Sequence, residues 1–113
     1  MMHHYFSLLF RSERNLLDGL RWFSQGSGVQ QGEIMPEFPD NPDREERFRE
    51  KYPDCVGFYC IFDEPSEQFV PMREFMGELD EMCRTYLEDK EEAYKKNVKA
   101  YLEAIAKRYE HLL

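Results

Sequence analysis

The sequence predicts a small α+β domain. Two or three antiparallel or mixed strands would form a sheet packed with helices, and the C-terminal part would form a long helix or a helical hairpin. Short apolar runs bounded by Pro, Gly or charged residues lie within the first 62 residues and are typical of strands. Apolar residues then recur at helical spacing from about residue 68 to 112. A chain of 113 residues can bury one core, so we expect a single domain over residues 1–113.

The N-terminal segment predicts a strand followed by a helix. Residues 5–10 alternate side chains between the two faces of an extended chain. Ser12 is a typical helix N-cap, and residues 13–24 then place apolar side chains on one stripe of a helical wheel: Leu16, Leu20 and Phe23.

The middle of the chain predicts a loop, an edge strand and a short helix. The stretch QGSGVQQG is a loop, and residues 33–38 follow as an edge strand because Pro36 cannot donate a ladder hydrogen bond. Asn41 and Pro42 resemble an N-cap and a first helical residue. We therefore expect a charged helix over residues 43–51, anchored by two aromatic residues, Phe48 and Tyr52.

The stretch CVGFYCIF, residues 55–62, predicts a central strand covered on both faces, because both of its alternating sets of side chains are apolar. Its two thiols, Cys55 and Cys60, would point to opposite faces of the strand. Opposite faces cannot supply two sulfurs to one zinc ion, so we interpret both cysteines as core residues.

The C-terminal third is expected to be helical from Ser66 onward. Two apolar stripes, over residues 72–87 and 94–112, are joined by EDKEEA with no Gly or Pro between them. One continuous helix over residues 68–112 would measure about 67 Å, which is too long for this domain to cover. The chain therefore folds back near Asp89, or a second subunit covers the overhang. Either antiparallel arrangement would place the acidic first arm beside the Lys-rich second arm.

The charge distribution limits the classes of partner. The net charge is −8, and residues 33–92 hold 19 of the 23 acidic residues against 7 of the 15 basic ones. Direct nucleic-acid binding requires a basic surface and is not expected, whereas a protein partner with a basic surface fits. We find no membrane span and no signal peptide, so a cytoplasmic protein is expected. Three irregularly spaced cysteines form no disulfide framework.

Motifs for catalysis or cofactor binding are weak, and no cofactor or metal is expected. The three glycines of the QGSGVQQG loop lack the strand before them and the Lys-Ser/Thr pair of a phosphate loop. Cys83 lies in an apolar stripe, where burial would suppress its reactivity. Asp63 and Glu64 follow the central strand and would suit a divalent metal or an acid–base pair, but we favour a solvated turn before the next helix.

Trp22 falls off the buried stripe of its helix, beside Arg21. It would either pack under the loop of residues 25–41, which we favour, or anchor a contact with a partner. The candidate partner-binding residues are accordingly this pair and four acidic side chains of the middle segment: Glu45, Glu46, Asp63 and Glu64.

These observations favour a small acidic binding protein without catalysis, acting as an inhibitor, an immunity protein or a regulator through protein–protein interaction. One alternative is a homodimeric structural or assembly protein whose C-terminal helices pack across a two-fold axis. Another is a metal-dependent hydrolase that uses Asp63 and Glu64 together with Glu33 or Glu37.

Overall fold

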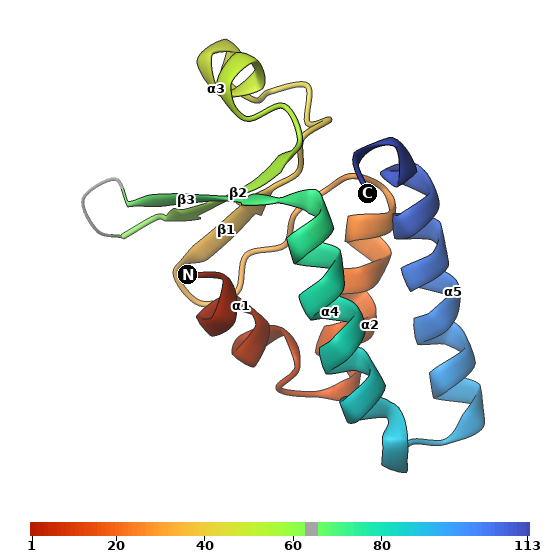
Figure 1. Ribbon diagram of the computed structural model, residues 1–113. Coiled ribbons are helices and arrows are strands. Elements are labelled where there is room, and N and C mark those ends of the chain that lie inside the picture. The colour runs from red at the N-terminus through yellow and green to blue at the C-terminus, as the bar shows by residue number, and fades with distance from the viewer. Residues whose placement is uncertain (63–65) are drawn as a thin grey trace.

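The computed structural model describes residues 1–62 and 66–113, and their fold is α+β, as the sequence predicts. An antiparallel sheet has the order β1 (Ile34–Glu37), β2 (Cys55–Cys60) and β3 (Glu67–Pro71). The described residues also form four longer helices: α1 (Met2–Leu9), α2 (Glu13–Ser24), α4 (Met72–Tyr86) and α5 (Glu92–Arg108). Of these, α4 contacts the sheet, whereas α5 packs on α2. Figure 1 shows the sheet on one side of the molecule and α2, α4 and α5 on the other. The short helix α3 (Glu46–Lys51) lies apart from these four.

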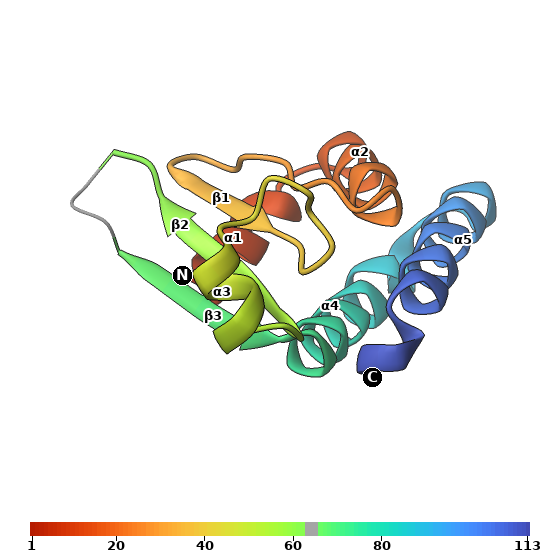
Figure 2. The same ribbon diagram turned by 90° about the horizontal axis from the view of Figure 1, so that it is seen from above.

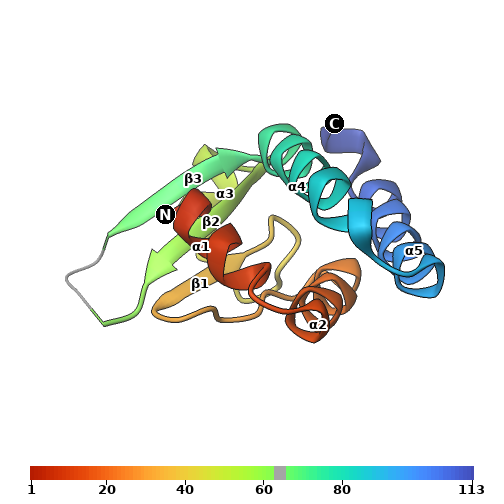
Figure 3. The same cartoon turned by 90° about the horizontal axis from the view of Figure 1, so that it is seen from below.

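The sheet has an inner face, covered by α1 and α4, and an outer face, covered by α3. Figure 2 shows α3 in front of the strands, whereas Figure 3, from below, shows α1 in front of them. Strand register places Val56, Phe58 and Val70 on the inner face, and all three are buried. The outer face carries Glu37, Gly57 and Phe69 side by side, followed by Met35, Tyr59 and Glu67.

The central position of β2 confirms the prediction for CVGFYCIF, except at its end. β2 pairs with a strand on each side and buries residues on both faces. It ends at Cys60, however, and Phe62 is 72% exposed. The expectation that the covered strand continues to residue 62 is therefore wrong. Beyond Cys60 the chain leaves the area that the helices cover.

The N-terminal segment is a helix, so the predicted strand over residues 5–10 is wrong. Met2, Tyr5, Phe6 and Leu9 recur at helical spacing and are all buried in the core. A short run of apolar residues satisfies both periodicities, and tertiary packing selected the helical one. The Tyr5 hydroxyl donates a hydrogen bond to the carbonyl of Val29 at 2.5 Å, which joins α1 to the loop after α2.

Helix α2 forms as predicted. The Ser12 hydroxyl accepts a hydrogen bond from the backbone N–H of Asn15 at 3.1 Å, which caps its first turn. The predicted stripe is buried, and Phe23 joins a cluster of aromatic rings with Phe38 and Phe75 at centroid distances of 5.1 and 5.9 Å. The loop after α2 runs tightly along β1. A Cβ atom at Gly28 would lie 2.0 Å from the carbonyl oxygen of Pro36, so only glycine fits.

The C-terminal third begins with a strand and not with a helix. Residues expected to be helical from Ser66 form β3, because they pair with β2 to complete the sheet. α4 follows at Met72, and the chain reverses through a 3-10 turn at Leu87–Asp89 into α5. Of the alternatives left by the sequence, the chain thus adopts the fold back near Asp89 (Figure 1). None of the ion pairs found in residues 1–62 and 66–113 joins α4 to α5, so the opposite charges of the two arms are not matched in pairs.

Helix α3 begins later than predicted. Asn41 caps a turn through a bond from the Asp43 backbone N–H at 2.9 Å, but the helix starts only at Glu46. Arg44 lies between them and is turned inward, where its guanidinium bonds the carbonyls of Cys55 and Tyr52. This buried arginine holds the backbone out of helical geometry. The predicted anchors are confirmed, since Phe48 is buried and Tyr52 stacks on Phe69 at 4.1 Å.

Among the described residues, no helix has both the length and the apolar character needed to cross a membrane.

Candidate partner-binding surface

The start of α3 brings together two of the predicted partner-binding residues on the outer side of the sheet. Glu45 is the N-cap residue of α3 and Glu46 is its first residue, and both are exposed. The Glu45 carboxylate pairs with the Nε of Arg47 at 2.7 Å. Both partners of this pair are largely exposed, so water and salt weaken it. The two glutamates therefore present negative charge to solvent next to the sheet.

Glu45 also lines a hollow between α3 and the outer face of the sheet, which we call the acidic hollow. Its volume is about 270 Å³, and its lining combines three carboxylates with two aromatic rings: Glu37, Asp43, Glu45, Phe48 and Tyr59. Glu37 comes from β1 and Tyr59 from β2, so the rigid sheet positions the floor while α3 and the turn before it supply the rim. Among the residues that the structure describes, no basic side chain lines the acidic hollow.

Gly57 positions Tyr59 over the sheet. A Cβ atom at residue 57 would lie 2.9 Å from the Tyr59 hydroxyl, so the absent side chain leaves the space in which that ring lies. The hydroxyl reaches to 3.5 Å from Oε1 of Glu37. Burial, and then the charge of Glu37, raise the pKa of Tyr59 to about 12, so the phenol stays neutral and serves as a donor.

Arg44 lies behind the floor of the acidic hollow, with a side chain that is 0% exposed. Its Nη1 donates to the Cys55 carbonyl at 2.7 Å and its Nη2 to the Tyr52 carbonyl at 3.1 Å. Its Nε faces Oε1 of Glu37 at 3.8 Å and has no hydrogen-bond partner among the described residues. Burial raises the pKa of Glu37, and the charge of Arg44 opposes that shift. The Glu37 carboxylate is thus partly desolvated and only weakly bonded.

A second hollow of about 400 Å³ adjoins the first through Asp43 and extends toward the C-terminal end of α5. There Asp40 accepts a bond from the Arg108 guanidinium at 2.8 Å and another from the Tyr109 hydroxyl at 2.6 Å. These bonds tie the loop after β1 to α5, so Asp40 is already paired. The remaining negative charge of this region lies at Glu37, Asp43 and the start of α3.

The remaining predicted residues do not join this surface. Trp22 is 46% exposed on α2 and does not pack under the loop of residues 25–41, so the packing that we favoured is wrong. Arg21 is exposed beside it, and none of the hydrogen bonds or ion pairs formed by residues 1–62 and 66–113 joins this pair to α3. Asp63 and Glu64 lie outside the described residues.

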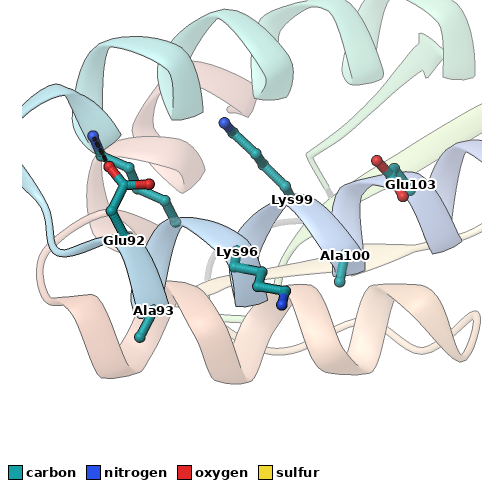
Figure 4. A pocket seen from close by; sticks show the side chains of 7 residues that line it. Glu92, Ala93, Lys96, Lys99, Ala100 and Glu103 are labelled. Atoms are coloured by element: carbon teal, nitrogen blue, oxygen red, sulfur yellow. Dashed lines mark hydrogen bonds and ion pairs between the residues drawn. The ribbon is translucent and has the colours of Figure 1, made fainter.

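The Lys-rich face of α5 surrounds a hollow of about 610 Å³. Figure 4 shows its lysines extending in different directions, with Lys96 and Lys99 pointing apart. All seven lining residues belong to α5 itself, so no second element closes the hollow. Side chains that diverge from one helix do not converge on a ligand, and we interpret this face as solvated surface.

Cys55 and Cys83 are buried, whereas Cys60 is only partly buried, so the interpretation of Cys60 as a core residue is wrong. Burial raises the pKa of Cys55 to about 11 and that of Cys83 to about 12, which keeps both protonated and unreactive near neutral pH. Cys55 and Cys60 lie five residues apart on β2 and therefore on opposite faces. In the part of the chain that the structure describes, no three His, Cys, Asp or Glu side chains converge as metal ligands would.

Sequence reasoning missed Glu37, Asp43 and Arg44 as members of one site. The available signal was an arginine, Arg44, flanked directly by Asp43 and Glu45. Its inward direction depends on carbonyl groups of residues 52 and 55, whose positions are fixed only after the sheet forms.

Comparison with known proteins gives one match. The family model described as CDI immunity protein matches residues 1–109. No curated protein and no solved structure matches the chain. Because the match spans nearly the whole sequence, the chain belongs to the CDI immunity protein family, whose members bind a toxin partner, and it acts through protein–protein interaction. The immunity function predicted from size and charge is thereby confirmed.

Proposed function

We propose that this CDI immunity protein recognises its toxin through the acidic surface on the outer side of the sheet, and that the toxin presents a basic site there. The observation that carries the proposal is the acidic hollow with its rim, where three carboxylates meet two aromatic rings and no basic side chain takes part in the lining. Carboxylates on such a surface accelerate encounter with a basic partner and exclude partners of like charge. We place this encounter in the cytoplasm.

Electrostatic recognition makes binding sensitive to salt. Raising the ionic strength from about 0.05 to about 0.5 M shortens the Debye length severalfold, so the association rate with the toxin should fall steeply. The measurement is surface plasmon resonance or stopped-flow fluorescence with the purified toxin. An association rate that is constant over this range would contradict the proposal.

Charge-reversal variants test which part of the protein attracts the toxin. The double variant Glu45→Lys with Glu46→Lys should weaken toxin binding by roughly tenfold or more, because two carboxylates become repulsive toward a basic site. The control is Glu103→Lys with Glu110→Lys, which makes the same change in net charge at exposed positions of α5 and of the C-terminal turn. Equal losses in the two variants would show that only the net charge matters. No loss in either would reject an acidic binding surface.

Arg21 and Trp22 form a separate candidate contact, because an exposed tryptophan beside an arginine is typical of interface anchors. Asp63 and Glu64 stay predictions of the sequence. The case for a homodimer rested on a helix overhang that needed a cover, and the fold back at Leu87–Asp89 supplies that cover within one chain. We therefore propose a one-to-one complex with the toxin. Light scattering that shows a dimer of the free protein at micromolar concentration would contradict this.

A further inference from the structure

We infer that the acidic hollow is a receptor for a single arginine side chain of the toxin, with the Glu37 carboxylate as its principal acceptor. The inference rests on the proposed function and deepens it, since it assigns the chemistry of one contact within the acidic surface. The volume of the acidic hollow, about 270 Å³, gives room for one side chain.

The Glu37 carboxylate has unused capacity to accept hydrogen bonds. Among the described residues, the only hydrogen-bond partner of the Glu37 side chain is the Tyr59 hydroxyl at 3.5 Å, the limit of such a bond. A carboxylate can accept about four hydrogen bonds. Removal from water without bonds in return is costly for an ionised group, and an incoming cation would offset that cost. Asp43 and Glu45 add two more carboxylates around the same space.

Arg44 gives the second, independent observation. A fully buried guanidinium whose Nε has no acceptor is rare, because an unsatisfied buried donor costs roughly 1–3 kcal/mol. That donor is aimed at Glu37 across 3.8 Å, so the wall of the acidic hollow is incompletely bonded on its inner side. Because two backbone carbonyls hold the rest of the guanidinium, Arg44 cannot move outward to complete the pair. Glu37 thus has capacity for a donor from the open side.

The aromatic walls favour arginine over lysine. Phe48 and Tyr59 lie 6.4 Å apart by ring centroids, and a planar guanidinium stacks on such rings while its N–H groups bond a carboxylate in pairs. The chain already shows this combination at the rim. The Arg47 guanidinium lies 4.4 Å from the Phe48 ring centre and bonds Glu45 at 2.7 Å. That contact is exposed, so an arginine of the toxin can compete with it.

Positively charged arginines near the acidic hollow weaken its attraction for an incoming cation. Arg44 and Arg49 both lower the pKa of Glu37, and Arg49 bonds the carbonyls of Asn41 and Pro42. Arg44 acts from a buried position behind the floor and Arg49 from the exposed surface of α3, whereas the three carboxylates line the open space. The local field therefore favours a cation that approaches from outside the sheet.

The test uses a probe of the side chain alone. N-acetyl-arginine amide is titrated into the ¹⁵N-labelled protein and followed by NMR, with N-acetyl-citrulline amide as a neutral control of the same shape. Saturable shifts should appear at residues 37, 43–48 and 59 with the arginine probe and be at least several times smaller with citrulline. Shifts that are equal for the two probes, or absent from these residues, would overturn the inference.

Variants make the test specific. Glu37→Gln and, separately, the exposed Asp43→Asn should each reduce the shifts produced by the arginine probe, while Glu50→Gln, an exposed glutamate of α3 outside the hollow, should not. The same variants are measured with the toxin, where Glu37→Gln should cost roughly tenfold in affinity. An unchanged toxin affinity of the Glu37→Gln variant, with binding still sensitive to salt, would reject the arginine receptor alone. Salt-independent toxin binding in every variant would reject the proposed function instead.

Discussion

The two faces of the sheet use the same strands in opposite ways. On the inner face, Val56, Phe58 and Val70 meet apolar side chains of α1 and α4, and each is buried without any polar group to satisfy. On the outer face, a buried arginine and an under-bonded glutamate lie beneath the short helix α3. Dry packing of the first kind stabilises the fold. An incompletely satisfied polar group lowers stability and calls for an explanation. Stability thus comes from the inner face, and the proposed function gives the outer face a role in recognition.

The largest expected effect on stability comes from truncating a core side chain that packs on the inner face of the sheet. Phe75 lies within 5.3 to 6.1 Å, by ring centroids, of four other phenylalanines, so Phe75→Ala should lower the free energy of unfolding by about 3–5 kcal/mol. Chemical denaturation measures it, with Phe62→Ala as the control because that ring is mostly exposed. Toxin affinity of the folded fraction should not change. A loss below about 1 kcal/mol would contradict the described core.

Removal of the buried arginine should be the next largest effect. Arg44→Ala leaves Glu37 without its opposing charge and frees two backbone carbonyls, which should cost roughly 3 kcal/mol of stability. The matched control is the exposed Arg47→Ala, whose pairs lie in solvent and should contribute less than about 1 kcal/mol. Equal stability of the two variants would show that Arg44 does not hold the outer face together.

The pH dependence of stability tests the partial burial of Glu37 on the outer face of the sheet. The folded pKa of Glu37 is raised, mainly by burial, so the folded protein holds its proton to a higher pH than the unfolded chain does. Its contribution to stability is therefore favourable at low pH and is lost as the pH rises through the folded pKa. The pKa of Asp80 on α4 is also raised. A variant at Glu37 retains Asp80, so this contribution cancels when the variant is compared with the parent protein.

Glu37→Gln should accordingly be at least as stable as the parent protein at neutral pH, and its stability should fall less as the pH rises above the ordinary pKa of 4.5. Thermal unfolding at a series of pH values measures this. Glu50→Gln, an exposed change of the same kind, should leave the pH profile unaltered. A parent protein that gains stability over the variant as the pH rises would contradict the burial of Glu37.

The smallest expected effect on stability is at Trp22. Because 46% of its surface is exposed, Trp22→Ala should change the free energy of unfolding by only about 0.5 kcal/mol, as is usual for surface residues. If the toxin also contacts α2, its affinity should fall by much more than stability does. A variant that loses neither affinity nor stability would confine recognition to the outer side of the sheet.

The sequence was informative where one periodicity was long enough to exclude the other. Helices α2, α4 and α5 carry apolar stripes over 12 or more residues, and β2 is apolar on both faces between Pro and acidic signals. Short apolar runs led to wrong predictions of secondary structure. Residues 5–10, five of which are apolar, fit a strand as well as a helix. The segment of residues 67–71 becomes a strand only because β2 offers it a partner.

The sequence by itself determined an α+β fold, a single core and an excess of negative charge between residues 33 and 92, because these follow from composition and local periodicity. Only the tertiary structure decided where that charge gathers. Glu37, Asp43 and Tyr59 lie on different segments and meet because β1 and β2 pair, and Arg44 turns inward because that pairing fixes the carbonyls it bonds. Contacts between distant segments depend on the whole packed chain, so no local pattern reveals them.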